Sequence, residues 1–179
     1  MSFCDNYRLM ARYNRWINQR VYEAAGRLTE EERQRDRGAF FGSIHRTLQH
    51  LVVADQIWLK RFIPCADQSG IDSGMLGSDV LDLPTPSALD MLLFADWAPL
   101  LRKRVQLDAA IDEWTAGFSD AFLNSTMRYG NSKGVQRAHP AWQALTHFFN
   151  HQTHHRGQAT TLLAQAGVDL GVTDLVALL

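Results

Sequence analysis

The chain has 179 residues, of which 46% are hydrophobic and 21% charged, and its formal net charge is −1. This length suffices for one compact domain with a real core, and the near-zero charge gives no reason to expect a nucleic acid or an anionic membrane as partner. No apolar run approaches the roughly 18–20 residues of a membrane span, and residues 1–10 lack the apolar core of a signal peptide. Cys4 and Cys65 lie far apart and form no CxxC motif, which fits a reducing compartment. We therefore expect a single soluble domain over residues 1–179 in the cytoplasm.

The first half of the chain predicts two long helices and a long loop. Apolar residues at helical spacing indicate a first helix over about 3–28. Ser43 is a suitable N-cap and Pro64 a suitable stop for a second helix over about 43–63. Residues 65–83 are rich in Gly, Ser and Asp without periodicity and are expected to form a loop.

The second half predicts two more long helices. Thr85 followed by Pro86 starts a third helix that runs to about residue 111, with a kink or break near residue 96 because Pro99 lies within it. Residues 124–138 contain a turn between two short extended pieces, which favours a short hairpin. A fourth helix follows Pro140 and ends at Gly167, and a short helix over 173–179 closes the chain. The predicted fold class is all-α, a four-helix bundle with long connections.

Asp55 lies in the middle of the apolar stripe of the second helix. A buried carboxylate is costly unless it is paired, so Asp55 requires a partner. One interpretation is a structural hydrogen bond to a neighbouring helix, which we favour. The other is a contact to a metal-binding side chain.

Four of the seven histidines fall within residues 147–155. Because residues four apart stack on one helix face, His151 and His155 share the apolar arc of the fourth helix. His154 points away and is expected to be exposed or to lie just outside the ligands, and His147 is intermediate and the reserve candidate. Two neutral imidazoles one turn apart can hold a single metal ion. The alternative interpretation, for any single one of these histidines, is a core residue that forms a hydrogen bond and binds no metal.

A third ligand has to come from another helix. His50 is the best candidate because it lies at the edge of the buried face of the second helix. His45 is expected to be solvated, and His139 precedes a proline in a predicted loop. Three imidazoles would leave an open position for water or substrate, and they discriminate poorly among Zn²⁺, Ni²⁺, Fe²⁺ and Mn²⁺.

Two other metal chemistries are excluded by residue type. The spacing of His151 and His155 is that of HExxH proteases, but Gln152 stands where the catalytic Glu would be and cannot take a proton. Carboxylate-bridged di-iron bundles need inward glutamates on several helices. No glutamate occurs in the predicted second, third or fourth helix.

These motifs resemble those of the DinB family of DNA-damage-inducible proteins. The resemblance rests on two stretches, 43–58 with its Ser-Ile-His-Arg-Thr-Leu-Gln-His-Leu start and 150–158 with Asn-His-Gln-Thr-His-His-Arg-Gly-Gln. It implies a four-helix bundle of the DinB/YfiT-like type that holds a divalent metal, often zinc or nickel, by three histidines, here His50, His151 and His155. It also implies a homodimer and a role in stress, and some members transfer low-molecular-weight thiols.

Three functions stay open at this point. A metal-dependent thiol S-transferase would use the open position to generate a thiolate from a small-molecule thiol. A metal-dependent hydrolase would activate water there, and a metal-stabilised dimeric stress or ligand-binding protein would have no turnover. Asn150 and Gln158 are candidates to orient a ligand, and Arg156 to pair with Asp55, while no general base stands out.

Overall fold

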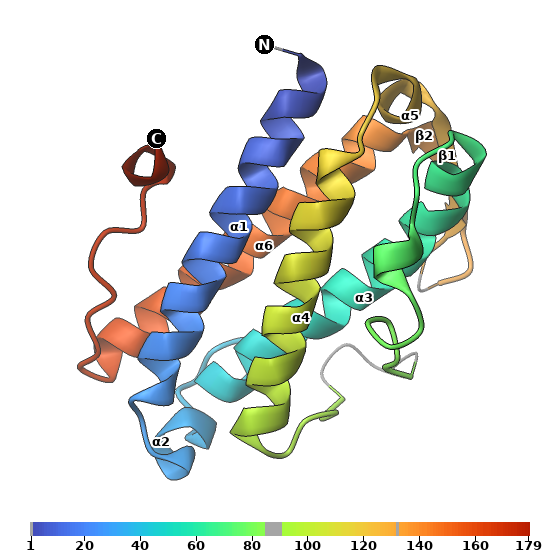
Figure 1. Cartoon of the computed structure of the whole chain (residues 1–179). Coiled ribbons are helices and arrows are strands. Elements are labelled where there is room, and N and C mark those ends of the chain that lie inside the picture. Colours follow the sequence, from blue (N-terminus) through green and yellow to red (C-terminus); the bar gives the residue numbers. More distant parts are fainter. Residues whose placement is uncertain (1, 85–90, 132) are drawn as a thin grey trace.

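The computed structural model describes residues 2–84, 91–131 and 133–179. Helices predominate, as predicted for an all-α chain, and a small two-stranded sheet accompanies them (Figure 1). The elements in chain order are α1 (Phe3–Gly26), α2 (Glu30–Gln34), α3 (Ile44–Gln68), the 3₁₀ helix η1 (Gly74–Leu76), α4 (Trp97–Ala116), α5 (Asp120–Asn124), β1 (Thr126–Gly130), β2 (Gln136–Pro140), α6 (Ala141–Gln165) and the 3₁₀ helix η2 (Leu175–Leu178).

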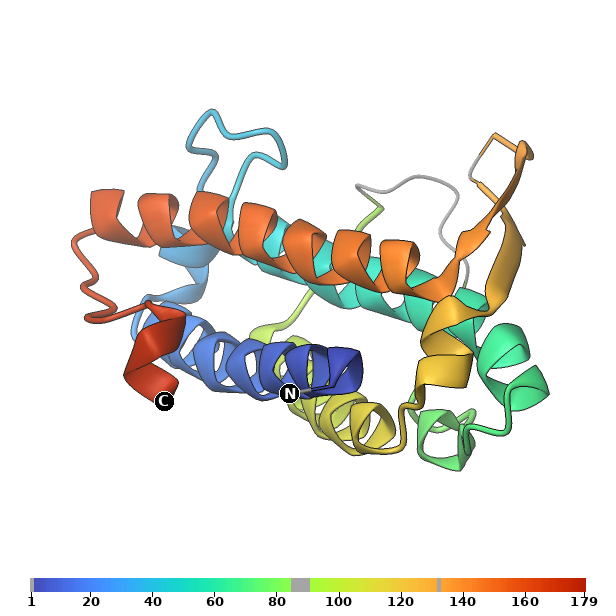
Figure 2. The same cartoon turned by 90° about the horizontal axis from the view of Figure 1, so that it is seen from above.

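The four long helices lie in two layers. α3 packs along α6, α1 packs along α4, and the layers touch through α1 with α6 and α3 with α4. Figure 2 shows the α3–α6 pair on one side and the α1–α4 pair on the other, with residues 35–43 and the β1–β2 hairpin rising from the outer side of the α3–α6 layer. Two of the connections therefore project from that outer side.

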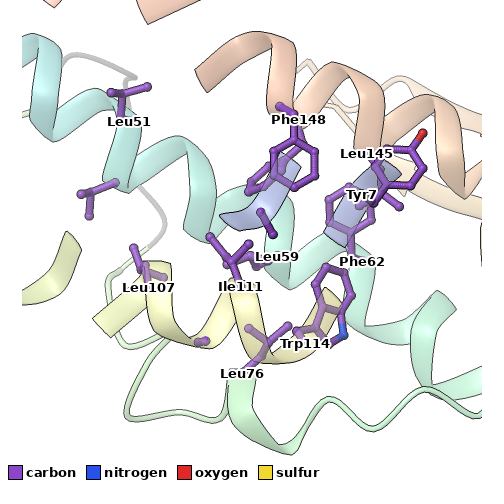
Figure 3. Packing of buried hydrophobic residues seen from close by; sticks show 14 of the residues in the cluster. Tyr7, Leu51, Leu59, Phe62, Leu76, Leu107, Ile111, Trp114, Leu145 and Phe148 are labelled. Carbon is purple, nitrogen blue, oxygen red and sulfur yellow. The ribbon is translucent and has the colours of Figure 1, made fainter. Parts of the chain in front are cut away.

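Apolar side chains from all four long helices fill the space between the layers. Phe62 of α3 meets Trp114 of α4 at a ring separation of 5.7 Å and Phe148 of α6 at 6.1 Å (Figure 3). Tyr7 of α1 is buried beside them, and its hydroxyl donates to the carbonyl of Trp142. The apolar arc predicted for the fourth helix is buried as expected and comprises Ala144, Leu145, Phe148, Ala159, Leu162 and Leu163.

The predicted stop of the second helix is wrong, because α3 continues through Pro64 to Gln68. Pro64 is exposed and removes only one hydrogen bond near the end of the helix. Cys65 and Ala66 in the same turn are buried in the core, and their packing outweighs that loss. The predicted 65–83 loop therefore starts later, and it contains η1.

The predicted third helix begins later than expected. Its expected cap at Thr85 and Pro86 lies outside the described residues, but residues 91–96 are not helical and α4 starts at Trp97. Pro99 is then the third helical residue, where a backbone N–H has no helical partner anyway, so the chain shows the expected break near residue 96 and no kink inside α4 is needed.

Two buried polar side chains of α3 hold residues 91–94 in their non-helical course. The Gln49 amide oxygen accepts from the backbone N–H groups of Leu93 and Phe94, and its nitrogen donates to the carbonyl of Met91. His45 Nε2 lies 2.7 Å from the carbonyl oxygen of Phe94. His45 is only 1% exposed, so the prediction that it is solvated is wrong.

The hairpin predicted near 124–138 is present. β1 and β2 are antiparallel, with Thr126 opposite Pro140 and Tyr129 opposite Arg137. The Asn131 carboxamide oxygen accepts from two backbone N–H groups of the turn, and Gly134 takes the positive φ of 75° that the turn requires.

The end of the chain also agrees with its prediction in outline. Gly167 has a φ of 78° just after α6, and the short terminal helix is the 3₁₀ helix η2. In the described ranges no helix combines the length and apolarity needed to cross a membrane.

Candidate metal centre

Three histidines from two helices meet between α3 and α6. His50 comes from α3, and His151 and His155 come from successive turns of α6. One nitrogen of each lies within 4.8 Å of the others, and the Nε2 atoms of His50 and His151 are 3.2 Å apart. Two ligands at the usual zinc–nitrogen distance and tetrahedral angle are separated by about 3.3 Å. The donor set and its spacing therefore fit a divalent metal ion.

The protonation state of the cluster also suits a metal. Burial lowers the pKa of His151 to about 3, and the neighbouring His155 and His50 rings add to the shift. Burial lowers the pKa of His155 as well. At neutral pH both rings are neutral, which is the form that offers a lone pair to a metal ion.

Gln158 determines which nitrogen of His155 is available. His155 Nδ1 lies 2.7 Å from Oε1 of Gln158, and because an amide oxygen only accepts, Nδ1 carries the proton. The lone pair is then on Nε2, as is usual for a metal-binding histidine oriented by an outer hydrogen bond. The sequence predicts that Gln158 orients a ligand, and in the structure its contact is with His155.

Phe41, which was not predicted from the sequence, covers the cluster. Its ring stacks on His50 at 4.1 Å and meets the edge of His155 at 5.5 Å, while the Phe41 side chain itself is 6% exposed. The turn that presents it is closed by hydrogen bonds from Arg37 N–H to the Gly42 carbonyl and from Gly42 N–H to the Ala39 carbonyl. A Phe-Phe pair bracketed by glycines before a helix cap was the available signal.

A buried polar network lies beneath the histidines, toward the α1–α4 layer. Asp55 accepts from Arg104 of α4 at 2.6 Å and from Gln152 of α6, and Arg104 also pairs with Asp108 at 2.9 Å. Burial raises the pKa of Asp55 and raises that of Asp108 to about 6. The described contacts of Asp55 are thus with other helices, as the favoured structural interpretation predicted.

Arg156 belongs to the same network, and it attracts Asp55 electrostatically without the predicted direct pairing. Its guanidinium donates to Asn14 and Asn18 of α1 and to Gln152, and it lies over the Tyr13 ring. At about 100° per residue Arg156 points from α6 toward α1, away from the face that carries His151 and His155. Arg156 therefore connects the α3–α6 layer with the α1–α4 layer.

The remaining candidates lie at the rim. The His147 ring is 5.9 Å from His151 and 4.9 Å from Trp58. Burial lowers the pKa of His147, and Arg61 and His139 lower it further. His154 is exposed, with its ring 4.8 Å from that of His155. Asn150 is exposed on α6, and no contact in the described structure links it to the cluster.

The fold and the histidine cluster together define a class of protein. This is a mostly helical protein whose two adjacent helices present three neutral imidazoles that could hold one metal ion, with part of His151 still accessible from outside.

Comparison with known proteins then identifies the family. The family model for the DinB family matches residues 1–179, so the chain belongs to the DinB family. Protein DinB of Bacillus subtilis (strain 168) is 28% identical over 165 residues, which cover 90% of this chain and 87% of that relative. No solved structure gives a significant match.

Proposed function

We propose that this protein is a metal-dependent thiol S-transferase with a detoxification or stress role, and that His50, His151 and His155 hold its metal ion. The observation that carries the proposal is the set of three converging nitrogens, two of them on rings kept neutral by burial. Zinc or nickel is the favoured ion, and iron or manganese is compatible with the same ligands. A divalent ion bound there would lower the pKa of a thiol and so supply a thiolate near neutral pH.

The chain's own residues favour a thiol over water as the nucleophile. Asp55 is the acidic residue of α3 nearest to the cluster in sequence, and it is occupied by Arg104 and Gln152. A free thiol has a pKa near 8.5, whereas water has one near 15.7, so a thiol depends far less on a general base. Phe41 keeps solvent from one side of the His50 ring. Gln158 holds the His155 ring with its proton on Nδ1, so that Nε2 has the free lone pair.

The reaction proposed is substitution at an electrophilic carbon. The sulfur of the thiolate forms a C–S bond, the leaving group departs with the electron pair of the broken bond, and the thiol proton passes to solvent. With a chloronitroaromatic as electrophile, chloride is the leaving group and the coloured thioether reports the rate.

The experiment compares the wild type with His151→Ala and His154→Ala after loading with zinc or nickel. His151→Ala removes a proposed ligand, and His154→Ala removes an exposed neighbour on the same helix. We expect His151→Ala to lose bound metal in elemental analysis and at least 100-fold in conjugation rate, with its helical circular dichroism retained, while His154→Ala stays close to the wild type. Equal metal content in both variants would refute the ligand assignment.

The same assay separates this function from its two rivals. A metal-loaded wild type that conjugates no thiol above the buffer rate favours a non-catalytic metal-stabilised stress or ligand-binding protein. A wild type that instead cleaves activated esters, with the activity lost in His151→Ala, favours the metal-dependent hydrolase.

The setting of the activity is also a proposal. We propose that the protein acts as a homodimer, as the family resemblance implies, and light scattering of the purified chain tests this. A reducing cytoplasm is the compartment we propose, supported by the two cysteines, Cys4 and Cys65, which are both free thiols.

A further inference from the structure

Arg61 lies on the same face of α3 as His50, three turns further along. Its guanidinium carbon is 5.0 Å from the ring centre of Trp58 and 5.1 Å from that of Tyr129, which the hairpin supplies. Trp58 in turn contacts His147, one turn from His151. The arginine is therefore held at the end of the row of side chains that begins with the three histidines.

No carboxylate balances this charge among the described residues. Arg33, Arg37 and Arg104, which are also buried or nearly so, each pair with a carboxylate at 2.7 Å or less. Arg61 has only the two aromatic rings as described partners, although it is partly withdrawn from solvent. The N–H donors of this ring-bound guanidinium are therefore available to a group from outside the chain.

The surroundings of Arg61 add positive charge. Lys60 is its neighbour in sequence, and its ammonium group donates to the Leu83 carbonyl at the edge of the same region. Arg137 is opposite Tyr129 in the hairpin register, so both side chains share one face of the hairpin. The nearby carboxylate of Asp82 is paired with Lys103 at 2.7 Å, so the field beside Arg61 attracts an anion.

A hollow beside Arg61 has room for such a group. It measures about 210 Å³, and its lining residues are Val53, Gln56, Ile57, Lys60, Arg61, Leu83 and Pro84. Gln56 holds its wall in place by accepting from Leu83 N–H and donating to the Val80 carbonyl. Val53 and Ile57 follow His50 at helical spacing, so an apolar strip joins the histidine cluster to the hollow.

We propose that Arg61 binds a carboxylate of the substrate, which makes the substrate an elongated anionic thiol. The eleven residues from His50 to Arg61 span about 16 Å of helix, and the arginine side chain leans back toward the histidines, so the carboxylate lies roughly 10–16 Å from the sulfur. A planar carboxylate matches the two-pronged edge of a guanidinium. The inference deepens the proposed function and depends on it for the sulfur end of the substrate.

The test measures binding, so that it does not depend on turnover. The probe is S-methylglutathione, which carries two carboxylates and a sulfur that cannot form a thiolate, and calorimetry follows its binding to metal-free and zinc-loaded protein. Arg61→Gln removes the charge, Arg61→Lys keeps the charge without the planar fork, and Arg102→Gln removes an exposed arginine from α4 as the matched control. The diethyl ester of the probe lacks the anionic groups.

We expect Arg61→Gln to weaken binding of the probe at least tenfold, Arg61→Lys to weaken it less, and Arg102→Gln to leave it unchanged. The ester should bind wild type no better than the acid binds Arg61→Gln. Equal affinities of wild type and Arg61→Gln, equal affinities of acid and ester, or no binding to the wild type would each overturn the proposal. If inorganic phosphate binds in a way that depends on Arg61 and the probe does not bind, the proposal is overturned and the group bound by Arg61 is a phosphate instead of a carboxylate.

The two proposals fail in different ways. If the thiol transfer proposal is wrong, the wild type conjugates no thiol, yet Arg61 still governs binding of the probe, and it does so in His151→Ala too. If the Arg61 proposal is wrong, conjugation proceeds, and Arg61→Gln leaves the affinity for the probe unchanged.

Discussion

At the scale of single residues, burial acts on charge in opposite ways on the two sides of α3. Toward the outer face it keeps His151 neutral and able to donate a lone pair. Toward α1 and α4 it encloses Asp55 and Asp108 and raises the pKa of both, while Arg104 lies between them and pairs with each. The same helix thus separates a site of neutral donors from a network of ion pairs, and the network's role is to hold helices together.

Asp108 makes this network sensitive to pH. Burial raises its pKa in the folded chain to about 6 from an ordinary value of 3.8, although Arg104 and Asn18 oppose the rise. Between these pH values the folded state holds a proton that the unfolded state has lost, so the stability contributed by this group is complete below about pH 4 and is lost as the pH rises through about 6.

Asp108→Asn removes this titration and provides the measurement. We expect the free energy of unfolding of the wild type, minus that of Asp108→Asn, to decrease as the pH rises from about 4 to about 7. Denaturant unfolding of both proteins over that range gives the difference directly. A difference that increases with pH would mean that the charged form is the one stabilised by the fold.

At the scale of elements, two glycines, one within α6 and one just after its end, play opposite roles. Gly167 ends the helix with a φ of 78°, a conformation that L-residues rarely adopt, and an added Cβ would touch nothing within 4 Å. Gly157 lies within the exposed part of the helix and also has open space around it. The two positions therefore differ in backbone conformation and not in packing.

This difference predicts opposite effects of the same substitution. Gly167→Ala should destabilise the protein by about 1–2 kcal/mol, because the Cβ of alanine disfavours the left-handed conformation. Gly157→Ala should stabilise it by up to about 1 kcal/mol, because alanine is the better helix former. Thermal unfolding of both variants checks the pair, and a shift of the same sign in both would contradict the assignment of Gly167 as the helix stop.

At the scale of the whole molecule, the histidine cluster is a potential cross-link between α3 and α6. His50 is about a hundred residues from His151 and His155 in sequence, so an ion that binds all three ties together the two helices of one layer. An ion that binds only the folded state stabilises it by about 2.7 kcal/mol at a free concentration of one hundred times its Kd.

The expected outcome is a metal-dependent melting temperature. Zinc or nickel should raise the Tm of the wild type by several degrees, by about 2–4 °C per kcal/mol for a chain of this size, and chelation should reverse the rise. His50→Ala should show no rise, because it leaves a pair of ligands on one helix only. A similar rise in His50→Ala would show that the ion does not link the two helices.

Much of the site follows from local pattern alone. The spacing of His151 and His155 and the apolar arc around them depend only on the 100° step of a helix, so the sequence predicts that they share one inner face. Three other predictions depend in the same way on neighbouring residues only: that Asp55 needs a partner, that a hairpin forms, and that the helix stops at Gly167. Each rests on residue types within one element.

Only the tertiary structure decided which distant residues meet. Arg104 is the partner of Asp55 and Phe41 is the cover of the cluster, because the layers bring α4 and the 35–43 turn to α3. His45 is buried against residues 91–94 for the same reason, and packing of the last turn of α3 outweighs Pro64. Such contacts depend on how whole helices pack, and the order of residues within one helix does not contain that information.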